Sequence, residues 1–110
     1  MTFTALRGFA ASFVMAAAII FNLGAPVRAQ EVKVTIDNFT FSPAELKLKV
    51  GDTVTWTNHD DIPHTVVSAG KFRSKTMDTD NTFSFTFTSA GDYKYFCSLH
   101  PHMTGMIKVE

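Results

Sequence analysis

Hydrophobic and polar residues alternate with a period of two along most of the chain after residue 30. In the stretch 83–87, for example, every second side chain is a phenylalanine. This alternation is typical of a β-strand with one buried face, and turn residues such as Gly51-Asp52 and Gly91-Asp92 separate the stretches that show it. The predicted strands are 32–36, 46–50, 53–58, 65–68, 83–87, 93–97 and 105–109. The pattern therefore predicts an all-β fold, a β-sandwich of about six to eight short strands.

Two stretches of this part of the chain lack the alternation. Residues 38–43 end in Pro43, which cannot donate a hydrogen bond inside a sheet, so we expect an irregular edge there. Residues 69–80 show no clear period and carry five charged side chains, and we expect them to form a solvated loop.

The N-terminus has the pattern of a secretory signal peptide. Arg7 precedes an apolar run of 15 residues, 9–23, and the small residue Ala29 follows at a suitable distance. We expect cleavage after Ala29, so that residues 1–29 are removed and residues 30–110 form one domain exported to the periplasm. An uncleaved membrane anchor fits less well, because 15 residues are short for a span that needs ~20.

Composition limits what the remaining 81 residues can do. The whole chain has a formal charge of zero, and nothing in it points to nucleic acid. A domain of this size has a marginal core, and secreted domains of this size usually add disulfides or a metal. Cys97 is the single cysteine and cannot form an internal disulfide, so a bound metal is the simplest explanation for its presence.

The segment 97–103 carries the ligands that such a metal would need. Cys97, His100 and Met103 are spaced as C-x2-H-x2-M, with Pro101 stiffening the segment. Since an extended triplet reaches only ~10 Å, a turn in this segment can direct all three side chains at one centre. His64 is the best candidate for a fourth ligand. A cysteine, two histidines and a weakly bound methionine are the ligand set of a blue copper electron-transfer site.

The expected roles follow from the donor types. Cys97 would bind as a thiolate, His64 and His100 would complete a trigonal plane, and Met103 would be a long axial ligand that helps to set the reduction potential. Zinc is the main competitor, because cysteine and histidine also bind zinc, but a thioether is not a normal zinc ligand. Taken singly, a buried cysteine is more often an inert apolar residue, and a lone histidine is more often structural. The conjunction of all four residues favours copper.

Three further residues are weaker candidates. His102 is expected to face solvent beside the site, where it would contribute to docking or offer a secondary metal contact. His59 lies in the polar loop before the predicted ligand His64 and is expected to be exposed. Met106 is the rival axial ligand, but it lies at the start of a predicted strand, beyond Gly105.

The sequence around these ligands resembles the cupredoxins, the blue copper proteins of the plastocyanin and azurin group. The resemblance rests on Pro63-His64 followed by Val66-Val67, and on the run from Gly91 to Gly105, and it covers residues 31–110. The two short gaps in the ligand segment look most like amicyanin. This resemblance implies a Greek-key β-sandwich with one type 1 copper ion near one end.

The chain departs from the usual cupredoxin pattern at three positions near the site. Thr65 stands where the family often has an asparagine whose side chain ties the two ligand loops together, and a hydroxyl can still hydrogen-bond there. Leu99 replaces a common proline and His102 a common aromatic residue.

The function expected from the resemblance is one-electron transfer between proteins by a monomer that cycles between Cu(II) and Cu(I). Electrons would leave through a partly exposed His100, and the flanking residues would form a small docking patch for transient encounters; these residues are Pro63, Leu99, Pro101 and His102. In amicyanin-like proteins the donor is an amine-oxidising dehydrogenase and the acceptor a c-type cytochrome.

Two other functions compete with electron transfer. A periplasmic copper carrier or buffer would use the same four ligands. A nitrite reductase or multicopper oxidase needs further copper centres built from several more histidines, and the four histidines of this chain do not supply them. We therefore expect a protein that is not an enzyme.

Overall fold

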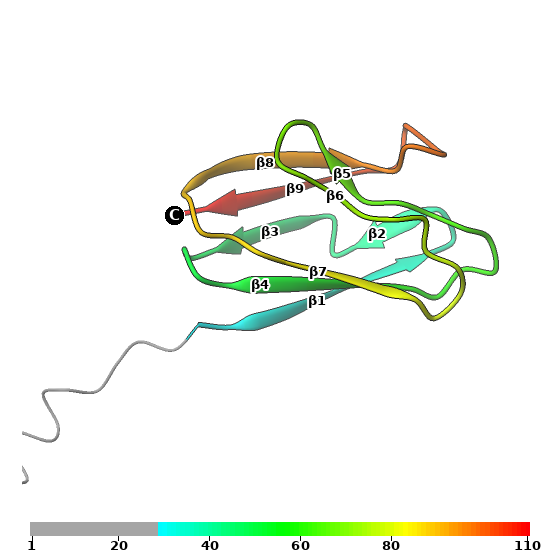
Figure 1. Ribbon diagram of the computed structural model, residues 1–110, viewed down its shortest axis with the longest axis horizontal. Helices are drawn as coiled ribbons and strands as arrows, with labels where there is room; N and C mark the ends of the chain where they lie inside the picture. The colour runs from blue at the N-terminus through cyan, green and yellow to red at the C-terminus, as the bar shows by residue number, and fades with distance from the viewer. Residues whose placement is uncertain (1–28) are drawn as a thin grey trace, which may run out of the picture.

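The computed structural model describes residues 29–110, and in this range all regular structure is β-strand. Nine strands form two sheets that face each other (Figure 1). The strands are β1 (Glu31–Asp37), β2 (Thr40–Ser42), β3 (Glu45–Leu48), β4 (Thr53–Asn58), β5 (Val67–Ser68), β6 (Phe72–Arg73), β7 (Thr82–Thr86), β8 (Gly91–Phe96) and β9 (Thr104–Val109). The predicted all-β sandwich is confirmed.

The two sheets are built from strands far apart in the sequence. One sheet has the order β2-β1-β4-β7, with β1 parallel to β4 and the outer strands antiparallel to their neighbours. The other has the order β3-β9-β8-β5-β6, in which β3 runs parallel to β9 with Leu46 opposite Ile107. Each parallel pair brings together segments that are not joined by a hairpin, as expected for a Greek-key arrangement.

The core lies between the sheets and follows from the alternation of the strands. Val54 and Trp56 of β4 are fully buried while the threonines that alternate with them are only partly covered. Tyr95 of β8 stacks edge-on against Trp56, with ring centroids 5.5 Å apart. Its ring lies directly over Gly105 on β9, where any Cβ atom would overlap it. Glycine at position 105 is therefore what allows this tyrosine to enter the core.

Two sequence expectations need correction. Residues 69–80 are not simply a solvated loop: they contain β6, and Phe72, Ser74 and Met77 are buried. The irregular spacing of these residues hid their burial from a period-based prediction. Residues 38–43 contain the short edge strand β2, paired with β1, so the irregularity is confined to the turn before it. With β2 and β6 included, the nine strands exceed the expected six to eight.

The loops that carry the predicted ligands gather at one end of the sandwich. In Figure 1 the segment after β8, the loop after β4 and the turn between β1 and β2 all lie at the right-hand end, whereas the C-terminus lies at the left. The predicted signal peptide lies, apart from Ala29, outside the described residues. Within residues 29–110 no helix is long and apolar enough to cross a membrane.

Candidate metal centre

Three of the predicted ligands converge at this end of the sandwich. The Sγ atom of Cys97 lies 3.7 Å from Nδ1 of His64 and 3.7 Å from Nδ1 of His100, and the three donor atoms lie within 4.8 Å of one another. Cys97 and His64 are completely buried, whereas His100 is half-buried. The structure thus brings together a sulfur and two imidazole nitrogens from segments more than thirty residues apart.

His64 is held in place by backbone pairing as well as by its side chain. It forms an isolated β-bridge with Met77, in which each residue donates its N–H to the other's carbonyl oxygen, at 3.1 and 2.8 Å. This bridge explains why Met77 is buried in a segment that shows no strand period. It anchors the loop after β4 against the segment that follows β6.

The segment 97–103 turns twice and returns to where it began. The N–H of His100 donates to the carbonyl of Cys97 at 3.2 Å, and the N–H of Met103 donates to that of His100 at 2.9 Å. The N–H of Cys97 then donates to the carbonyl of Met103 at 3.1 Å and closes the loop. Met103 is only 3% exposed. The expected turn is present, and it places the thioether residue beside the cysteine with its side chain buried.

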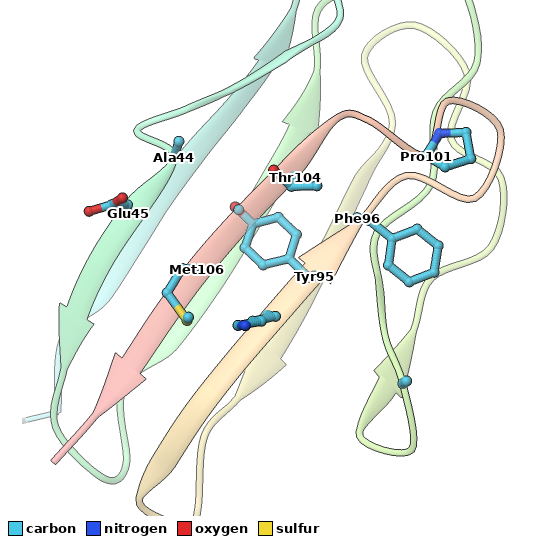
Figure 2. A pocket seen from close by; sticks show the side chains of 10 residues that line it. Ala44, Glu45, Tyr95, Phe96, Pro101, Thr104 and Met106 are labelled. Atoms are coloured by element: carbon cyan, nitrogen blue, oxygen red, sulfur yellow. The ribbon is translucent and has the colours of Figure 1, made fainter.

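The rival methionine lies elsewhere. Met106 is in the middle of β9, next to the fully buried Ile107, so it projects from the opposite, outer face of the sheet. There it lines a groove of about 600 Å³ together with Phe96, Pro101 and Thr104 (Figure 2). This position favours Met103 over Met106 as the thioether ligand.

The other candidate histidines are exposed. His102 is exposed beside the site, as expected. His59 is also exposed, and its Nδ1 lies 3.9 Å from a carboxylate oxygen of Asp80. Leu99 is 49% exposed, and both Pro63 and Pro101 are exposed. The half-buried imidazole of His100 therefore lies among exposed apolar side chains.

Thr65 joins the two ligand loops. Its backbone N–H donates to Sγ of Cys97 at 3.4 Å, while its hydroxyl oxygen accepts the N–H of Ser98 at 2.7 Å. The same hydroxyl is 2.8 Å from the hydroxyl of Ser98. A threonine at this position thus makes the connection between loops that the resemblance assigns to an asparagine.

Asp60 is a functional residue that the sequence patterns did not reveal. Its Oδ2 atom lies 2.8 Å from Nε2 of His64 and also accepts the backbone N–H of Phe39 at 3.0 Å. These two contacts lower the pKa of the Asp60 carboxyl, the Phe39 N–H contributing more than His64. An ionised carboxylate at Nε2 keeps the proton on that nitrogen and leaves the Nδ1 lone pair directed at the cluster. Neither the hydrophobic alternation nor the spacing of the ligands in the sequence connects Asp60 with the site.

The thiol of Cys97 is poised to ionise. Burial raises its pKa, but the N–H groups of Thr65 and Leu99 and the contacts of the sulfur with the His64 and His100 rings outweigh that effect and lower the pKa from 9.0 to about 6. The thiolate is the form that binds metals. A thiolate, two imidazole nitrogens and a buried thioether residue form a donor set that suits copper in both oxidation states.

Phe39 is a second residue that the sequence analysis missed. Its ring stands perpendicular to both imidazoles, with centroid distances of 5.0 Å to His100 and 5.6 Å to His64, and interplanar angles of 88°. It is also 47% exposed, which is unusual for a phenylalanine. Its place in the turn between β1 and β2 gave no sign of this contact.

Comparison with known proteins gives consistent results. Residues 9–109 match the family described as Cupredoxin-like domain. The amicyanin of Paracoccus versutus is 38% identical over 92 residues, which cover 78% of this chain and 70% of that protein. Amicyanin-alpha of Methylorubrum extorquens is 34% identical over 113 residues, covering 96% and 93%. A solved structure of an oxidized amicyanin mutant superposes with a TM-score of 0.70 at 37% identity, covering 73% of this chain and 82% of that one.

Proposed function

This chain belongs to the cupredoxin-like family, and we propose that it is a blue copper protein that carries single electrons between redox partners. One observation carries the proposal: a buried, readily ionised thiol lies 3.7 Å from the Nδ1 atoms of two histidines that come from different loops. Such a soft, mixed sulfur and nitrogen donor set is the one that supports Cu(II)/Cu(I) chemistry.

His64, Cys97, His100 and Met103 would hold the ion. Copper, when bound, supplies a one-electron couple between Cu(II) and Cu(I). The protein's part is to keep the donors where both oxidation states accept them. Asp60 fixes the ring of His64, and Thr65 fixes the ligand loop through Ser98, so little has to move when the charge at the site changes.

His100 is the proposed route by which electrons enter and leave. It is half-buried, whereas the other three proposed ligands are buried. Leu99 and Pro101 on either side of it are exposed and apolar, and with Pro63 and His102 they form the proposed docking patch. A small patch of this kind suits the weak, short-lived contacts of redox proteins. The family resemblance favours an amine-oxidising dehydrogenase as donor and a c-type cytochrome as acceptor.

The proposal includes processing and location. Removal of residues 1–29 would release a monomer of residues 30–110 into the periplasm, where redox partners of this kind are found. The domain described by residues 29–110 has a complete sandwich, with every strand paired in one of the two sheets. The segment that the proposal removes is therefore not needed to form either sheet.

The experiment is a copper titration of residues 30–110, followed by visible absorption and electron paramagnetic resonance. We expect one copper per chain, an intense thiolate-to-Cu(II) charge-transfer band, and reversible bleaching by ascorbate. Cys97→Ala should abolish the band and serves as the control. A colourless complex that readily gives copper to a chelator would instead indicate a copper carrier, and no copper binding would refute the proposal.

A further inference from the structure

Phe39 occupies a backbone conformation that phenylalanine avoids. It follows Asn38 in the two-residue turn between β1 and β2, and both residues have positive φ, 50° for Asn38 and 57° for Phe39. Turns of this kind favour glycine at the second position, because a side chain there is sterically strained. A strained residue persists when surrounding contacts hold it, and such residues concentrate at functional sites.

The contacts that hold Phe39 come from the candidate metal centre. Its backbone N–H donates to the Asp60 oxygen that also contacts His64. Its ring stands edge-on to His100 at 5.0 Å, a geometry that favours one orientation of each ring relative to the other. One end of this residue is thus fixed by the carboxylate and the other lies against an imidazole.

The two histidines of the site are restrained in different ways. The ring of His64 is buried and hydrogen-bonded to Asp60 through Nε2. The ring of His100, among the hydrogen bonds formed within residues 29–110, contacts only Sγ of Cys97, and it is half-buried. No carboxylate or carbonyl in this part of the chain orients it. Two rings stand edge-on to it with centroids 5.0 Å away, those of His64 and Phe39, and Phe39 is the one that is not itself a proposed ligand.

We infer that Phe39 is a positioning residue for His100: its ring fixes the orientation of this imidazole, as Asp60 does for His64. The inference rests on the proposed copper site. Asp60 supports both histidines. It contacts His64 directly, and it supports His100 by holding the strained turn that presents the Phe39 ring. If Phe39 had no role beyond the turn, its replacement by glycine or asparagine, which tolerate positive φ, would increase the stability of the protein.

The test compares variants that keep the turn but differ in the ring. Phe39→Asn removes the ring and retains a residue that adopts positive φ, whereas Phe39→Tyr keeps an aromatic ring. Val50→Asn is the matched control, because Val50 is similarly exposed, at 50%, but lies in the turn between β3 and β4 at the opposite end of the sandwich (Figure 1). Side-chain NMR relaxation of the two histidine rings is measured in the metal-free protein.

We expect Phe39→Asn to lower the order parameter of the His100 ring, while that of the His64 ring stays unchanged. Phe39→Tyr and Val50→Asn should leave both rings rigid. An unchanged His100 ring in Phe39→Asn would overturn the inference, and so would an equal loosening of both histidines, since that would indicate a general loss of structure.

The copper-loaded protein gives a second readout. Phe39→Asn should change the electron paramagnetic resonance spectrum and the reduction potential relative to the wild type. Phe39→Tyr should leave both at their wild-type values. Because the relaxation experiment needs no metal, it tests Phe39 even if the wild-type protein fails to bind copper. A failure of the proposed function and a failure of this inference are therefore separable.

Discussion

Thr65 donates its backbone N–H to the sulfur of Cys97 over 3.4 Å, and its hydroxyl oxygen lies 3.8 Å from the same atom. The two residues belong to loops that are 32 positions apart, so this contact couples the first ligand loop directly to the second. The hydroxyl also accepts the N–H of Ser98, the residue that follows the cysteine. Thr65 therefore supports the thiolate through its backbone and the ligand loop through its side chain.

Replacement of the hydroxyl separates these two effects. Thr65→Val keeps the shape and the backbone N–H but leaves the N–H of Ser98 without its acceptor. We expect the free energy of unfolding of the metal-free protein to fall by about 0.5–1.5 kcal/mol, the usual net contribution of one intramolecular hydrogen bond. Denaturant unfolding measures this, with Thr65→Ser as the control that retains the hydroxyl. Equal stability of the valine variant and the wild type would contradict this account of the loop connection.

The axial ligand can be tested with two methionine variants. Met103→Ala should retain copper and the thiolate band but shift the reduction potential, because a weak axial thioether tunes the potential without holding the ion alone. Met106→Ala removes the methionine of the outer groove and should leave the potential unchanged (Figure 2). Voltammetry of both proteins decides the assignment. The reverse result would transfer the axial role to Met106.

Gly105 should tolerate no side chain. A Cβ atom there would lie 2.6 Å from Cε1 of Tyr95 and would overlap the rest of the ring edge, so the tyrosine must move within a filled core. We expect Gly105→Ala to destabilise the protein by about 1–3 kcal/mol or more through overpacking. Thermal unfolding measures this effect. Combined with Tyr95→Leu, Gly105→Ala should cost less than the sum of the two single changes, because the clash is then absent, and an additive double variant would argue against the clash.

Asp52 should make stability depend on pH. Its carboxylate accepts the backbone N–H of Gln30 at 2.8 Å and that of Lys49 at 2.9 Å, and these bonds, the first contributing more, lower its pKa from the ordinary 3.8. A lowered pKa in the folded state means that the contribution is fully present above pH 3.8 and is lost as the pH falls through the folded value. Asp52→Asn should therefore lower the melting temperature near about pH 7, and the difference from wild type should narrow below about pH 4.

Melting curves across this range measure the effect. A gap that stays constant with pH would mean that the two N–H bonds do not depend on the charge of Asp52.

A charge in the docking patch should slow electron transfer without altering the site. Leu99→Glu places like charges opposite each other when two copies meet at His100, so electron self-exchange between reduced and oxidised copies should slow by about tenfold or more at low salt. Val50→Glu makes the same charge change at an equally exposed apolar residue at the far end and should have little effect. NMR line broadening gives both rates. Equal slowing by the two variants would indicate a net-charge effect and would argue against docking at Leu99.

The strands and the ligand segment were accessible from sequence because they depend on local patterns. Regular alternation revealed the strands that fill the core, and the spacing of Cys97, His100 and Met103 within seven residues made their convergence a matter of one turn. The roles of Asp60 and Phe39 were not accessible, since they depend on a positive φ in the first turn and on two loops that meet only in the folded protein. The burial of Phe72 and Met77 was missed for a similar reason. Their burial comes from pairing across turns, of Phe72 with Ser68 and of Met77 with His64, and their own spacing is irregular.

The parallel pairing of β3 with β9 has a consequence for how this protein acquires its structure. Leu46 has its partner in Ile107, more than sixty positions later, so this sheet contact closes a very long loop. Domains dominated by such distant contacts fold in milliseconds to seconds, and much more slowly than domains built from neighbouring segments. Met103 stands directly before β9, whose pairing with β8 closes the ligand segment, so the thioether would reach its place when β9 joins the second sheet. Maturation of the centre would then be limited by the rate of chain folding, and copper supplied during refolding would report the arrival of the final strand.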